Sequence, residues 1–237
     1  KKQTTVHVAD LASTTNVDES AAAINANVLL IGGNNLSAFV GASGVGVNLS
    51  GMSLGVALVT EQVTGNATPR KWTSVEATVA SASVQGVSGL TVTVDTMALQ
   101  VNRKAADNTL IDYSLTASTT DAADARNTNL SIASGPTSAV QMTMNGADGE
   151  YTKLTGHLTL NVFDFVTVSG DFGIEKKQTT VHVADLASTT NVDESAAAIN
   201  ANVLLIGGNN LSAFVGASGV GVNLSGMSLG VALVTEQ

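Results

Sequence analysis

The fold is indicated most clearly by residues 158–174, LTLNVFDFVTVSGDFGI. Apolar side chains fill most even positions of this stretch, and Thr, Asn, Ser and Asp fill most odd ones. A period of two residues is typical of a β-strand that buries one face. We therefore predict one long strand here, with a bend or bulge at Gly170 and with Phe163 and Phe165 on the opposite face.

Residues 175–178, Glu-Lys-Lys-Gln, predict a charged turn after this strand, from which Val181 and Val183 return as an antiparallel partner. A change of phase near Asp95 and Thr96 predicts a bulge. The other strands that we expect are 27–31, 37–40, 75–84, 110–117, 129–133 and 139–144. Turn residues separate them, in particular Gly32-Gly33-Asn34-Asn35 and a hairpin signal at Asn145-Gly146.

The chain also contains a perfect internal copy. Residues 1–62 recur without change as residues 176–237, which fixes a period of 175 residues. We interpret the chain as a partial repeat, 1–62, followed by one complete period, 63–237, with no internal linker. Identical neighbours are typical of a body that grows by addition along one axis, where each unit meets the next through the same interface.

Composition supports an all-β fold. Hydrophobic residues make up 44% of the chain, yet only 3% of residues are aromatic and only 12% are charged. Val, Leu, Ala and Ile therefore supply the apolar content, while Thr, Ser, Asn and Gly supply uncharged polar positions and turns. We predict mainly antiparallel long strands in a continuous tandem-repeat tube, a barrel-like solenoid or a stacked sheet.

Charge and aromatic content narrow the range of partners. The net charge is −9, and an acidic surface repels phosphate backbones, so we expect no nucleic-acid partner. A membrane β-barrel needs aromatic girdles at both interfaces, which one Trp and two Tyr do not supply, so no membrane insertion is expected. The expected partners are adjacent identical repeats or other copies of the chain.

Several phrases resemble tandem repeats of very large bacterial proteins that are secreted or displayed on the cell surface. These phrases are 166–176 (VTVSGDFGIEK), 36–41 (LSAFVG), 49–60 (LSGMSLGVALVT) and 84–92 (VQGVSGLTV). The resemblance implies an extracellular or cell-surface location in a protein that carries adhesin-like modules elsewhere. It carries over no functional residues. The glycine-rich calcium repeat of some such proteins is absent, because Gly32-Gly33-Asn34-Asn35 lacks the following Gly-x-Asp.

No catalytic residues emerge from the sequence. His157 and the two copies His7 and His182 have no second His or Cys at ligand spacing, so we interpret them as surface histidines. Trp72, Met142 and Met144 are interpreted as packing residues. No nucleophile and base stand in a recognisable pattern, and we expect no enzymatic activity and no cofactor apart from calcium.

Acidic loops give the only ligand hypothesis. The candidate calcium ligands are Asp121, Asp124, Asn145, Asp148 and Glu150, because calcium takes six to eight oxygens, often from such loops. The simpler interpretation is that Asp and Asn favour turns. The expected function is a fibre shaft, stalk or extender of a giant secreted or cell-surface protein. The alternative is an adhesin-type module that holds calcium or glycans through these loops.

Overall fold

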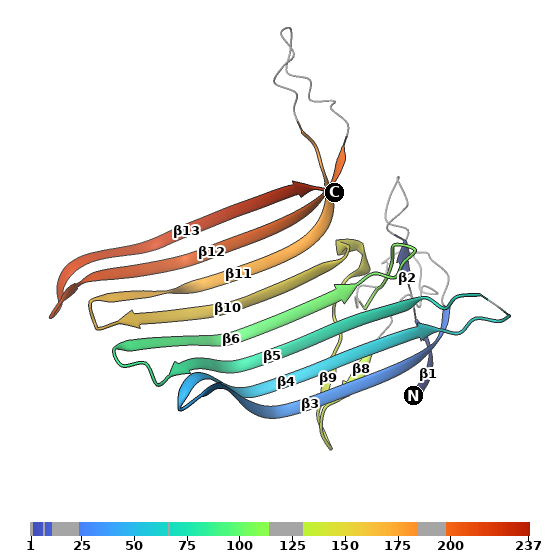
Figure 1. Ribbon diagram of the computed structural model, residues 1–237, viewed down its shortest axis with the longest axis horizontal. Helices are drawn as coiled ribbons and strands as arrows, with labels where there is room; N and C mark the ends of the chain where they lie inside the picture. The colour runs from blue at the N-terminus through green and yellow to red at the C-terminus, as the bar shows by residue number, and fades with distance from the viewer. Residues whose placement is uncertain (1, 7, 11–23, 66, 114–129, 184–197) are drawn as a thin grey trace, which may run out of the picture.

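A computed structural model describes residues 2–6, 8–10, 24–65, 67–113, 130–183 and 198–237 (Figure 1). One antiparallel sheet dominates the molecule, with strand order β1-β3-β4-β5-β6-β10-β11-β12-β13. Its strands are β1 (Lys2–Val6), β3 (Ile24–Ala42), β4 (Val45–Glu61), β5 (Lys71–Gln85), β6 (Leu90–Arg103), β10 (Tyr151–Val162), β11 (Val166–Val181), β12 (Ile199–Ala217) and β13 (Val220–Glu236). The predicted all-β, antiparallel, long-strand architecture is confirmed. The sheet is open, since β1 and β13 stand at opposite ends of the order.

A small second layer packs on one face of this sheet. It is formed by residues 104–113 and 130–150, which leave the end of β6 and return to β10. Its elements are β7 (Thr109–Ile111), β8 (Ser131–Ala133), β9 (Ala139–Gln141) and a 3₁₀ turn, η1 (Gly146–Asp148). The segment β2 (Val8–Asp10) pairs with β7, and β8 pairs with β9. Strands β8 and β9 lie against β3 and β4, so the layer covers strands that precede it by many residues.

The hydrophobic core lies between the second layer and the strands of the large sheet that this layer covers. Its buried members come from both sides: Val6, Val8, Ala26, Val28, Ala57, Val59, Trp72, Ala105, Ile111, Tyr113, Leu130, Ile132, Met142, Met144 and Tyr151. The predicted packing roles of Trp72, Met142 and Met144 are confirmed. On the other face of the sheet, Leu29, Ile31 and Leu58 remain partly exposed, because no second layer covers that face among the described residues.

The predicted single strand over 158–174 is wrong, since a turn at residues 163–165 divides it into β10 and β11. Phe163 and Asp164 adopt φ of 51° and 55° there, and the Asn161 amide donates to the Asp164 carboxylate at 2.9 Å. Val162 pairs with Val166 across a loop with an odd number of residues, so both strands keep their apolar side chains on even positions. The alternation therefore runs unbroken through a hairpin.

Other turn predictions also need correction. Residues 175–178 lie within β11, where 175–177 pair with β10 and all four pair with β12, so they form no hairpin tip. Residues 32–35 form an irregularity within the continuous strand β3, where Asn35 has φ of 52°. Asn145-Gly146 opens the 3₁₀ turn between strands of different sheets rather than a hairpin. At residues 175–178 and 32–35, extensive pairing with neighbouring strands outweighs the local turn preference of Lys, Gly and Asn.

The predicted bulges are confirmed. The β11–β12 register shifts between Ser169 and Asp171, where β12 carries one extra residue opposite Gly170. The β6–β10 register shifts opposite Thr96, which has φ of 52°. Strand 75–84 lies within β5, 139–144 shortens to β9, and the described part of 129–133, residues 130–133, shortens to β8. Of 110–117, residues 114–117 lie outside the described residues.

The two copies of the repeat form the same hairpin. Strands β3 and β4 are identical in sequence to β12 and β13, and the two pairs share one register, for example Val28 with Val59 and Val203 with Val234. In the strand order, β12 stands six places beyond β3. Within the described residues, no helix has the length and apolarity to cross a membrane.

Successive copies are also offset along the strands. Stepping across the sheet from partner to partner, the path runs Leu30, Ala57, Ser74, Asn102, Tyr151, Lys177, Val203. Val203 is the copy of Val28 and not of Leu30. The second copy is therefore staggered by two residues relative to the first.

Candidate interface between repeats

The two identical hairpins lie in different surroundings, which makes them a matched pair. We call β3–β4 the N-terminal hairpin and β12–β13 the C-terminal hairpin. Val59 is 1% exposed, whereas its copy Val234 is 52% exposed. Val8, which precedes the N-terminal hairpin, is 3% exposed, and its copy Val183 is 50% exposed. In the part of the chain that the structure describes, β5 pairs with the N-terminal hairpin, and β8 and β9 of the second layer contact it, so these elements account for the difference.

Strand β5 supplies the first part of the contact. It pairs with β4 from Gly46–Gln85 at one end to Thr60–Lys71 at the other, along almost the whole of β4. The corresponding edge of β13 has no strand beside it among the described residues. The contact is therefore a ladder of backbone hydrogen bonds that adds the hairpin to the sheet.

Trp72 anchors the apolar part of the contact. It lies opposite Val59 in the ladder and is 2% exposed. Its indole Nε1 donates to the carbonyl oxygen of Thr109 at 3.0 Å, which ties β5 to the second layer. Burying an aromatic ring with its polar atom satisfied is among the larger single contributions to packing. The N-terminal hairpin therefore packs against this ring.

A buried polar network joins β5 and β6 to the second layer. The Asn102 side-chain amide donates to the Ile111 carbonyl oxygen at 3.0 Å, and Ser74 Oγ donates to Asn102 Oδ1 at 3.0 Å. The Tyr113 hydroxyl completes the chain by donating to Ser74 Oγ at 3.0 Å. Burial raises the pKa of Tyr113 far above its ordinary value, so the hydroxyl keeps its proton. All these residues belong to the period 63–237, so the receiving face (β5, β6 and the second layer) is built by one period.

An ion cluster closes the end of the interface. The Arg70 guanidinium pairs with Glu61 at 2.7 Å and with Asp107 at 3.2 Å, and its carbon lies 5.3 Å from the centre of the Trp72 ring. The hydrogen bonds from Arg70 lower the pKa of Glu61 below its ordinary value, although partial burial opposes them. Arg70 thus joins the last residue of the N-terminal hairpin to the second layer. Glu236, the copy of Glu61, forms no ion pair of this kind among the described residues.

Two glycines allow the second layer to approach the hairpin. A Cβ built at Gly32 would overlap the carbonyl oxygen of Ala133, and one at Gly55 would lie 2.9 Å from Val140 Cγ1. At their copies Gly207 and Gly230, a Cβ would meet nothing within 4 Å. A side chain at these positions would therefore clash with the second layer in the first copy, whereas it would meet open space in the second copy.

Replacing Gly32 by Ala is expected to destabilise the protein by roughly 1–3 kcal/mol, because the second layer must move to make room for the methyl group. Gly207→Ala, the same change in the C-terminal hairpin, is expected to be neutral or slightly stabilising. Equilibrium unfolding in urea measures both. Equal losses for the two variants would show that the effect comes from strand propensity and not from the interface.

The predicted calcium ligands lie apart from this interface. Asp121 and Asp124 lie outside the described residues. Glu150 pairs with Arg103 at 3.1 Å, while Asn145 and Asp148 line a separate hollow. No group of three or more His, Asp or Glu suited to a metal ion occurs in the part of the chain that the structure describes. Calcium binding remains a prediction.

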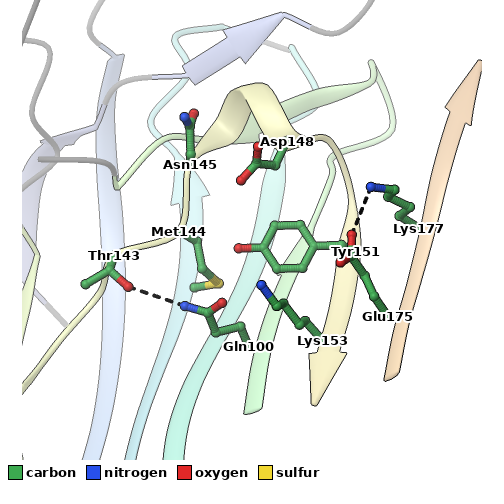
Figure 2. A pocket seen from close by; sticks show the side chains of 9 residues that line it. All are labelled: Gln100, Thr143, Met144, Asn145, Asp148, Tyr151, Lys153, Glu175 and Lys177. Atoms are coloured by element: carbon green, nitrogen blue, oxygen red, sulfur yellow. Dashed lines mark hydrogen bonds and ion pairs between the residues drawn. The ribbon is translucent and has the colours of Figure 1, made fainter. Parts of the chain in front are cut away.

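The hollow has a volume of about 350 Å³ and lies where the second layer meets β6, β10 and β11 (Figure 2). It is lined by Gln100, Thr143, Met144, Asn145, Asp148, Tyr151, Lys153, Glu175 and Lys177. Its charges are mixed, and Lys177 pairs with Glu175 at 3.0 Å. Burial, with the nearby Asp148 carboxylate, raises the pKa of Tyr151. The lining therefore shows no excess of one charge that would select an anion or a cation.

The histidines in the described residues fit the surface interpretation. His157 lies opposite Asp171 in the β10–β11 ladder, and its Nδ1 lies 2.8 Å from the Asp171 carboxylate. His182 is exposed, and His7 lies outside the described residues. The sequence patterns did not predict the receiving face, although Trp72 and the paired glycines Gly32 and Gly55 were available as signals. Searches of family models, curated proteins and solved structures found no match to the chain.

Proposed function

We propose that this chain is a structural tandem-repeat segment, a shaft or extender in which successive copies share one continuous sheet. The proposal rests on one observation: the N-terminal hairpin continues into β5, while the identical C-terminal hairpin presents the same edge uncovered. A following copy would supply its own β5 and second layer to that edge. The joint would then repeat at every copy.

The opposite end of the sheet supports the same arrangement. In the second copy, β11 pairs with β12 from Val166–Val215 to Val181–Ile199. In the first copy, β1 pairs only with residues 24–28 of β3, in the matching register. A preceding copy would extend β1 into a full β11 and cover the rest of the edge of β3.

Strand number makes this growth regular. Equivalent strands lie six steps apart in the strand order, and an even number of steps restores the strand direction in an antiparallel sheet. Each copy therefore meets the next in the same orientation. The acidic net charge of −9 favours mutual repulsion between finished shafts, which suits a segment of a secreted or cell-surface bacterial protein.

Electron microscopy of chains with two, four and six full periods tests the proposal. Six strand spacings of about 4.8 Å predict that particle length grows by about 29 Å for each added copy. Rods of uniform width whose length rises linearly with copy number are expected. Compact particles, or beads with variable spacing, would contradict the shared sheet.

A further inference from the structure

We propose that separate chains join end to end by exchange: the C-terminal hairpin (residues 199–236) of one molecule takes, on a second molecule, the place that the N-terminal hairpin (residues 24–61) occupies in its own structure. The inference rests on the proposed repeat-to-repeat joint, but it concerns separate chains rather than one long chain. The occupant of the open C-terminal hairpin is thus the receiving face of another copy of this protein.

Sequence identity makes the exchange possible. The incoming segment carries the same residues as the one it replaces, so every contact of Val59, Glu61 and Gly32 is available to Val234, Glu236 and Gly207. The C-terminal hairpin already has the register of the N-terminal hairpin. It also stands in finished form on β11, so docking requires little further ordering.

The hydrogen bonds that join β5 and β6 to the second layer all lie within the period 63–237. Ser74, Asn102 and Tyr113 form one network with the Ile111 carbonyl oxygen, and Trp72 donates to the Thr109 carbonyl oxygen. The resulting contact joins two different surfaces, head to tail. A contact of this kind extends into an open linear polymer rather than a closed dimer.

In the intact chain the two hairpins compete on unequal terms. The N-terminal hairpin is tethered to its site, which gives it a high effective concentration and favours the single molecule at low protein concentration. A substitution that weakens only the N-terminal hairpin should therefore shift the chain toward the polymer. The same substitution in the C-terminal hairpin should prevent polymer formation.

Cysteine crosslinking in the full chain tests this inference, since the natural sequence contains no Cys. Thr60 lies opposite Lys71, next to the pair in which Glu61 N donates to the Arg70 carbonyl oxygen at 3.0 Å. Thr60 and Lys71 are therefore a closely spaced, non-hydrogen-bonded pair that suits a disulfide. Thr235 is the copy of Thr60, and it lies on β13, five strands from β5. Lys71→Cys with Thr235→Cys can then close a disulfide only between molecules.

Under mild oxidation, the Lys71→Cys/Thr235→Cys chain is expected to give a ladder of covalent oligomers that strengthens with protein concentration. Adding Val59→Asp should increase the oligomer fraction at least tenfold at low concentration, and adding Val234→Asp instead should abolish the ladder. Lys71→Cys with Val220→Cys, at the far end of β13, controls for random collisions. Only monomer at every concentration, or a ladder that Val234→Asp leaves unchanged, would overturn the inference. Rods from covalently linked periods are a separate readout, so either result can fail alone.

Discussion

Val59→Asp is expected to lower the free energy of unfolding of the N-terminal hairpin by about 4 kcal/mol or more. The new carboxylate would lie in a position that is 1% exposed, between Val28 and Trp72 in the ladder, with no partner for its charge. Trp72 is the only tryptophan, so its fluorescence reports directly on the site. We expect a red shift of its emission and a lower midpoint of unfolding in urea at micromolar protein concentration.

The same substitution in the other copy is the control. Val234 has the same neighbours in sequence but is 52% exposed, so Val234→Asp should change stability by less than about 1 kcal/mol and leave the tryptophan emission unchanged. Because the two variants have the same composition and net charge, any difference between them reports the surroundings. Similar losses in both variants would contradict the assignment of the interface.

Trp72→Ala is expected to destabilise the protein by about 3–5 kcal/mol, the usual range for removing a large aromatic ring from a core. The change also removes the donor to the Thr109 carbonyl oxygen and the ring beneath Arg70. Since the variant lacks tryptophan, circular dichroism during thermal unfolding is the appropriate measurement. Hydrogen exchange should show that β4 loses protection while β10 and β11 keep it.

Two substitutions separate these effects. Trp72→Phe keeps an apolar ring but removes the indole N–H, so it should recover part of the loss. Phe163→Ala removes an aromatic side chain that is 65% exposed in the β10–β11 turn, and it should change stability by less than about 1 kcal/mol. A Phe163 variant as unstable as the Trp72 variant would place the aromatic contribution elsewhere.

The sequence was sufficient for the fold class because apolar alternation and low charge content can both be read from local stretches of the chain. Alternating Val and Leu, with few charges, predicts strands, and the antiparallel sheet of long strands confirms it. The bulge at Thr96 was also predictable, since a change of phase leaves a visible mark in the pattern, and the register shift at Gly170 is marked by a glycine within a strand. The period of 175 residues needs only comparison of the chain with itself.

The turn at Phe163 was hidden for a physical reason. A three-residue loop returns the chain with its parity unchanged, so Val162 and Val166 look like successive positions of one strand. Lys176 and Lys177 led to the opposite error. Their charges favour a turn in the prediction, whereas the strand ladder continues through them. Periodicity records which face a side chain occupies and does not record the direction of the chain.

The interface itself depends on contacts between distant residues. Residues 104–113 and 130–150 cover a hairpin that ends at Glu61, and no pattern within either segment indicates a contact with the other. Trp72 was recognised as a packing residue, but its partner Thr109 was not. The ligand hypothesis at Asn145, Asp148 and Glu150 followed from the oxygen donors of a predicted turn, and that local pattern did not indicate the ion pair between Glu150 and the distant Arg103.

The two-residue offset between Leu30 and Val203 has a consequence for how a shaft would display its surface. Two residues correspond to about 7 Å along a strand, while one copy advances about 29 Å across the strands. Each copy is therefore shifted sideways by roughly a quarter of its advance. Groups attached to the same residue of consecutive copies would therefore lie along a line that is oblique to the shaft axis, and not along a line parallel to it.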